Sequence, residues 1–107
     1  MCRAARPPRR YEIAVHVHSL AVIDQASGMP AAAERRYRHA LELKEELLGS
    51  EHPDLALVLN NLGTVLDEQN RPAEAAACYR SAFRIAERRL PPDHPTVAVI
   101  RSHVTHH

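Results

Sequence analysis

The chain contains two copies of one sequence pattern, and the second copy begins 42 residues after the first. When residues 29–65 are aligned with residues 71–107, 11 of the 37 positions are identical, and several others exchange one apolar residue for another. A period of this length is typical of solenoid proteins, in which each repeat buries its apolar face on its neighbours. The repeat therefore favours a scaffold that presents surface for binding over a catalytic domain.

Proline and glycine residues divide the sequence into five expected helices. Four helices are expected to begin at a proline, because the first turn of a helix does not need the N–H that proline lacks. These prolines are Pro30, Pro53, Pro72 and Pro95. The first helix is expected over residues 11–26, and Gly28 supplies the left-handed conformation that ends it. Pro91 and Pro92 end the fourth helix, since neither can donate a helix hydrogen bond.

Apolar residues recur at helical spacing and give each expected helix an inward face. In the first helix this face is predicted to contain Ile13, Val17, Leu20 and Ala21. Gly63 is predicted to let the fourth helix approach the third, with Tyr79 filling the groove between units. Aromatic residues make up only 4% of the chain, so the core is expected to consist mainly of small and aliphatic side chains at close helix spacing.

The small and large positions of both copies resemble those of tetratricopeptide repeats, in the longer kinesin-light-chain-like form with a 42-residue period. The matching residues of the first copy are Leu20, Ala21, Gly28, Ala33, Tyr37 and Ala40. Those of the second copy are Leu62, Gly63, Leu66, Ala75, Tyr79 and Ala82. Residues 48–54 and 93–95 resemble the linker between repeats of that family, and residues 59–62 resemble the signature of its first helix.

The resemblance implies an all-α, right-handed helical solenoid built from antiparallel helix pairs. It would consist of two tetratricopeptide units, at about residues 11–52 and 53–94, and one additional C-terminal helix in a partial third unit at residues 95–107. Residues 1–10, which contain two prolines and four arginines, are predicted to form a disordered basic tail.

Protein–protein interaction is the function that the resemblance implies, with a peptide or a partner helix held in a concave groove. In this family the first helix of each unit lines that groove. The corresponding positions here are His18, Val22, Gln25, Leu57, Asn60, Asn61, Thr64, Asp67, Ser102, His103 and His106. Most of these side chains are polar or aliphatic, so the sequence does not name the partner.

One specialised form of this groove holds the acidic C-terminus of a chaperone through a carboxylate clamp of Lys, Arg and Asn side chains. Asn61 could match one asparagine of such a clamp. However, His18, Val22 and His103 stand where the clamp needs Lys, Asn and Arg. A carboxylate without a charge-assisted donor binds weakly, so the clamp is not the favoured interpretation.

Catalytic, cofactor and metal roles are not indicated by the sequence. The chain has only three glycines and no phosphate-binding loop or nucleophile motif. His103 and His107 are four residues apart, as in a helical zinc pair, but no carboxylate or cysteine lies near them in the sequence. Cys2 and Cys78 form no CxxC motif, so a reducing, cytoplasmic location is the simplest expectation.

Charge gives no overall attraction to nucleic acid or to an anionic membrane, because the formal net charge is +1. The apolar stretch at residues 13–23 is also too short to span a bilayer. The basic residues Arg80, Arg84 and Arg88 form a stripe on the fourth helix, while acidic residues gather between positions 42 and 54. Such faces are usually solvated, but they also allow head-to-tail association.

Self-assembly is therefore the alternative function, with copies associating through the terminal helix or through charged faces. The last expected helix has no following helix to cover Val99. The sequence accordingly predicts either a monomer of marginal stability or a homo-oligomer formed through this last helix.

Overall fold

The computed structural model describes residues 7–105, and the side chains of residues 10–105, as five helices joined by short turns. The helices are α1 (Pro7–Ala26), α2 (Pro30–Leu48), α3 (Pro53–Glu68), α4 (Pro72–Arg89) and α5 (Pro95–Thr105). No strand occurs within this described range. The prediction of an all-α fold is therefore confirmed, and four helices begin at the prolines expected from the sequence.

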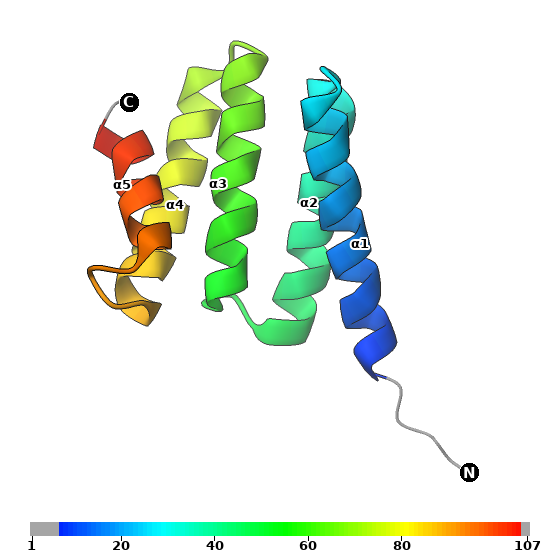
Figure 1. Cartoon of the computed structure of the whole chain (residues 1–107), viewed down its shortest axis with the longest axis horizontal. Helices are drawn as coiled ribbons and strands as arrows, with labels where there is room; N and C mark the ends of the chain where they lie inside the picture. Colours follow the sequence, from blue (N-terminus) through cyan, green and yellow to red (C-terminus); the bar gives the residue numbers. More distant parts are fainter. Residues whose placement is uncertain (1–6, 106–107) are drawn as a thin grey trace.

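The helices stack in chain order as a row of pairs (Figure 1). α1 packs on α2 and α3 packs on α4, while α2 and α3 join the two pairs and α5 packs on α4. Each helix therefore contacts mainly its neighbours in the sequence, which is the packing of a helical-repeat solenoid. This arrangement places α1 and α5 at opposite ends of the row.

Two histidines of the linkers cap the helices that follow them. The Nδ1 atom of His52 accepts a hydrogen bond of 3.1 Å from the backbone N–H of Asp54 at the start of α3. His94 repeats this contact at the start of α5, where its Nδ1 accepts from the backbone N–H of Thr96, also at 3.1 Å. Because the first N–H groups of a helix have no partner within it, these side chains explain why histidine precedes proline in both linkers.

Small residues and one tyrosine form the centre of each helix pair. Tyr37 and Tyr79 are 1% and 2% exposed, and they belong to one apolar cluster with Ala21 and Leu62. Gly63 lies against α4, as the sequence predicted, and the residue that it meets there is Tyr79. A second cluster extends this core through α3 and α4 to α5.

The start of α1 differs from the prediction. The helix begins at Pro7, four residues before the predicted start at Tyr11. Residues 7–10 are therefore helical and do not belong to the predicted disordered tail, because a proline in the first turn is compatible with a helix. Residues 1–6, the remainder of that predicted tail, lie outside the described residues.

The buried face of α1 also differs from the prediction. Ile13 and Leu20 were expected to point inward, but they are 46% and 44% exposed. Ala21 is fully buried, as predicted, and Val17 is half-buried, while Ala14, which was not predicted, is also fully buried. The second unit explains the error, because the equivalent residues Leu55 and Leu62 are 2% and 1% exposed there, where α3 packs between α2 and α4. No described helix covers the corresponding side of α1.

Candidate functional site

The described residues of the predicted groove lie on α1, α3 and α5. Pairs of polar side chains connect α1 to α3 and α3 to α5. The amide of Asn61 on α3 lies 3.2 Å from Nε2 of His18 on α1. At the equivalent positions of the next step the two residue types are exchanged, and Nδ1 of His103 on α5 donates to the Oδ1 atom of Asn60 on α3 at 2.7 Å. Both pairs join residues that are 43 positions apart, so one histidine–asparagine contact recurs at each step of the row.

Lys44 adds a third polar side chain to the contact between His18 and Asn61. The Nζ atom of Lys44, on α2, lies 3.4 Å from Nδ1 of His18, and the lysine side chain is almost fully buried. Burial and then the nearby ammonium charge lower the pKa of the His18 ring, although the charge of Asp54 opposes them. His18 is therefore favoured in its neutral form, in which the ring nitrogen without a proton can accept a hydrogen bond, either Nδ1 from Lys44 or Nε2 from Asn61.

Gln25 occupies the centre of a second set of contacts between α1 and α3. Its Nε2 atom donates to the hydroxyl of Thr64 at 3.0 Å and to Glu68 at 3.2 Å, while its Oε1 atom accepts from the hydroxyl of Tyr37 at 2.9 Å. Burial, with a further contribution from the charge of Glu68, raises the pKa of Tyr37 to about 12. Thr64 in turn donates to the carbonyl of Asn61 at 2.7 Å.

Asp67 and Tyr79 form the equivalent contact in the second unit. The Tyr79 hydroxyl donates to Oδ2 of Asp67 at 3.2 Å, and the His103 ring stacks on the Tyr79 ring with 4.7 Å between centroids. Burial, followed by the charge of Asp67, raises the pKa of Tyr79. These contacts hold α5 against the second unit. Asp67 and His103 were predicted to face a ligand, and here they contact other residues of the chain.

Three of the predicted groove residues are substantially exposed, namely Val22, Leu57 and Ser102. Asn60 is only 7% exposed and has little surface to offer a partner, because its side chain meets His103. The remaining described groove residues are half-buried and take part in the contacts above. His106 lies outside the described residues.

Two hollows on this surface are large enough to receive side chains. The first, of about 400 Å³, is lined by Val15, His18, Ser19, Val22, Ile23 and Lys44. The second, of about 270 Å³, lies between α3 and α5 and is lined by Leu57, Asn60, Asn61, Pro95, Thr96, Val99 and Ile100. Both combine aliphatic walls with polar side chains from the histidine–asparagine contacts, which is typical of ligand pockets.

Lys44 is the functional candidate that the sequence reasoning missed. It lies on α2, so an assignment restricted to the first helix of each unit could not include it. A signal was nevertheless present, because Lys44 continues the buried stripe of Ala33, Tyr37 and Ala40, and the equivalent residue of the second unit is Ala86. A charged residue in a buried stripe is uncommon and favours a functional role over a packing role.

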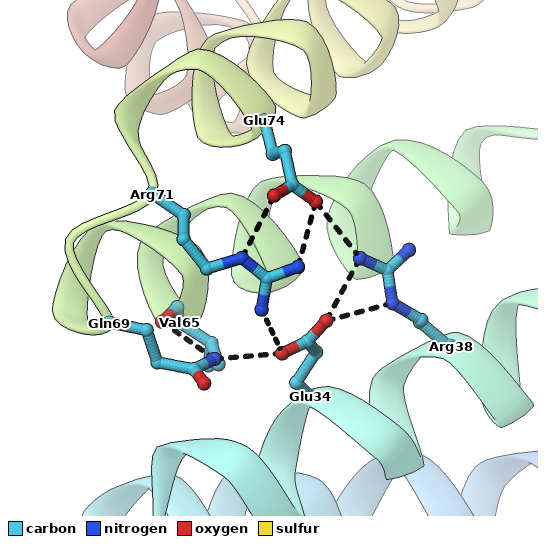
Figure 2. Close-up of polar contacts among 6 residues, drawn as sticks. All are labelled: Glu34, Arg38, Val65, Gln69, Arg71 and Glu74. Carbon is cyan, nitrogen blue, oxygen red and sulfur yellow. Dashed lines mark hydrogen bonds and ion pairs between the residues drawn. The ribbon is translucent and has the colours of Figure 1, made fainter.

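A different polar network ties α2 to the turn between α3 and α4 (Figure 2). The carboxylate of Glu34 accepts hydrogen bonds from Arg38 at 3.0 Å and from Gln69 and Arg71 at 2.8 Å each. Arg71 also binds both carboxylate oxygens of Glu74. These contacts connect side chains of α2 to the turn and the start of α4, so the network joins the two units.

Metal ligands do not gather in the described part of the chain. Among residues 7–105, no three His, Cys, Asp or Glu side chains come close enough together to hold an ion. Within the same range, no helix combines the length and apolar character that crossing a membrane requires.

The comparisons with known proteins agree with this geometry. The family model of the tetratricopeptide repeat matches residues 11–88, which include both helix pairs. A search of curated proteins gave no match. Tetratricopeptide repeats generally mediate protein–protein interactions, and the family is a non-catalytic scaffold type. With two repeat units stacked in a helical solenoid, this chain belongs to the tetratricopeptide repeat family.

Proposed function

We propose that this protein binds an extended segment of a partner protein in the hollow beside α1, and that it performs no catalysis. The segment would carry a carboxylate next to an aliphatic side chain. The observation that supports this proposal is the position of Lys44, whose side chain is 6% exposed and forms part of the wall of the hollow.

The ammonium group of Lys44 lacks an anionic partner within the described chain. Its one polar contact there is with the His18 ring, and no described carboxylate lies within ion-pair distance of it. Burying a charge without a counter-charge is costly, whereas a charge-assisted hydrogen bond to a carboxylate offsets that cost. A ligand carboxylate would therefore complete an interaction that the free fold leaves incomplete.

The rest of the hollow suits the aliphatic part of such a segment. Val15, Val22 and Ile23 are 37%, 45% and 58% exposed along one side of α1, and Ser19 lies between them. Leu57 continues this apolar surface onto α3, at the edge of the second hollow. A peptide that follows the row of first helices would thus meet apolar contacts on both sides of the Lys44 charge. We place this activity in the cytoplasm, where the half-buried free thiol of Cys78 would stay reduced.

N-Acetylleucine is a suitable first probe, because it joins one carboxylate to one aliphatic side chain. Lys44 is the only lysine of the chain, so its ammonium group can be followed alone by nuclear magnetic resonance. We expect weak binding, on the order of millimolar, with shifts at Lys44, His18 and Val22. The neutral amide of the same compound should produce much smaller shifts at Lys44.

The variant Lys44→Met keeps the length of the side chain and removes its charge, and it should abolish the difference between acid and amide. Arg84→Met, an exposed basic position on α4, is the matched control and should leave binding unchanged. Equal shifts with acid and amide, or shifts confined to α4, would refute the assignment of Lys44 as a carboxylate site.

A further inference from the structure

We propose that two copies of this chain associate through an apolar stripe on α1, with the two helices antiparallel. The stripe, here called the α1 seam, consists of Ile13, His16, Leu20 and Ile23. These residues lie within about 80° of one another around the helix axis, since successive residues are 100° apart. α1 stands at the outer end of the row of helices (Figure 1), and the three aliphatic residues of the seam are exposed there.

The internal repeat shows that the seam is a surface of the kind that is normally covered. Ile13, Leu20 and Ile23 are 46%, 44% and 58% exposed. Their equivalents in the second unit are Leu55, Leu62 and Val65, which are 2%, 1% and 0% exposed. The same sequence pattern is therefore buried on α3 and open on α1, because α3 packs between α2 and α4, whereas α1 packs mainly on α2 and this side of it has no described neighbour.

The spacing of the seam makes it complementary to itself. Its four positions are separated by three, four and three residues, so they are symmetric about position 18. In an antiparallel pair with a twofold axis near that position, Ile13 would face Ile23 of the second copy, and His16 would face Leu20 of the second copy. A twofold interface requires such reciprocal contacts. The same alternation of three and four residues forms the seam of two-stranded coiled coils.

A second copy fits the seam better than the other helices of the chain do. The helices that pack on α3 are α2 and α4, and both are already packed between neighbours. On α5, the other end of the row, Val97 and Ile100 are turned into the core, and Val99 is its one large exposed aliphatic residue. The seam offers three such residues and contains no charged residue of the Lys, Arg, Asp or Glu type.

Sedimentation velocity over roughly a hundredfold range of protein concentration tests this proposal. We expect the wild-type chain to shift from monomer to dimer within that range. Leu20→Glu places a charge at the centre of the seam, and it should remain monomeric while keeping the wild-type helix content in circular dichroism. His16→Val introduces the residue that occupies the equivalent position 58, and because it acts in both copies it should strengthen dimerisation by about tenfold or more.

Val99→Ser is the matched control, because it removes an exposed aliphatic residue of α5 and should leave the dimer unchanged. Cysteine cross-linking tests the orientation in a background of Cys2→Ser and Cys78→Ser. His16→Cys mixed with Leu20→Cys should form more disulfide between the two variants than within either one. A wild-type chain that stays monomeric throughout, a dimer that survives Leu20→Glu, or a dimer lost on Val99→Ser would each overturn the proposal.

Discussion

A Cβ atom added to Gly63 would lie 2.5 Å from Cε1 of Tyr79, which is closer than two carbon atoms can approach without movement. The Tyr79 ring is 2% exposed and its hydroxyl is bonded to Asp67, so the ring has little freedom to move away. The backbone of α3 thus contacts an aromatic ring of α4 directly. This contact sets the distance between the two helices of the second unit.

Gly63→Ala should therefore destabilise the protein by about 1–3 kcal/mol, even though alanine favours helices more than glycine does. Urea denaturation monitored by circular dichroism would measure this loss. The double variant Gly63→Ala, Tyr79→Leu provides the control, because a smaller side chain at position 79 should remove most of the cost of the added methyl group. An unchanged midpoint in the single variant would contradict the close packing of α3 on α4.

The close approach of α4 to Gly63 could be predicted from the sequence, because a glycine inside a helix lets a neighbouring helix come near. The buried face of α1 could not be predicted in the same way. Periodicity reports which residues are apolar, but it does not report whether a helix lies beside them. Ile13 and Leu20 match buried residues of α3, yet they are exposed because their side of α1 has no cover among the described helices.

Glu34→Gln should weaken the joint between the two units. The Glu34 carboxylate is largely buried and receives three hydrogen bonds, two of them from arginines. Replacing it with an amide leaves those donors less well satisfied, so we expect a loss of about 1–3 kcal/mol at neutral pH in urea denaturation. Glu74→Gln is the matched control, since Glu74 is much more exposed and should contribute less.

The effect of Glu34 should also depend on pH. Burial opposes ionisation of Glu34, but its hydrogen bonds with Gln69 and the two arginines outweigh burial and lower the pKa of this carboxyl group. A lowered folded-state pKa contributes stability above the unfolded-state pKa, and that contribution is lost as pH falls through the folded-state pKa. The wild type and Glu34→Gln should therefore converge in acid. A constant difference in stability from neutral to strongly acidic pH would contradict this account.

Removing the histidine caps should shorten the helices that they begin. His94→Ala leaves the backbone N–H of Thr96 without its side-chain acceptor, so we expect a loss of about 1 kcal/mol. His94→Asn keeps an acceptor near the same position and should retain most of the stability. Hydrogen exchange at Thr96 and Val97 would locate the effect, which should be confined to the start of α5. A loss spread evenly over all five helices would argue against a local cap.

The candidate site was only partly predictable, and the reason lies in the distribution of polar contacts. Groove positions follow from the repeat, and Val22 and Leu57 are exposed at those positions. The hydrogen bond between His103 and Asn60 could not be predicted from the repeat, because it depends on the distance between α3 and α5 rather than on either sequence segment. Lys44 was missed for a related reason, since its contact with His18 depends on how α2 packs on α1.

Lys44→Met should raise the pKa of His18 toward its ordinary value, because the variant removes the positive charge that disfavours the protonated ring. Titration of the His18 ring by nuclear magnetic resonance would measure this change, and Arg35→Met on the same helix is the control that should leave it unaltered. The folded-state pKa of His18 is lowered, so its contribution to stability is present above the unfolded-state value of about 6.5 and is lost as pH falls below it. Wild-type stability should therefore decline more steeply below that pH than the stability of Lys44→Met. An unchanged His18 titration in the variant would show that the Lys44 ammonium does not lie close to this ring in solution.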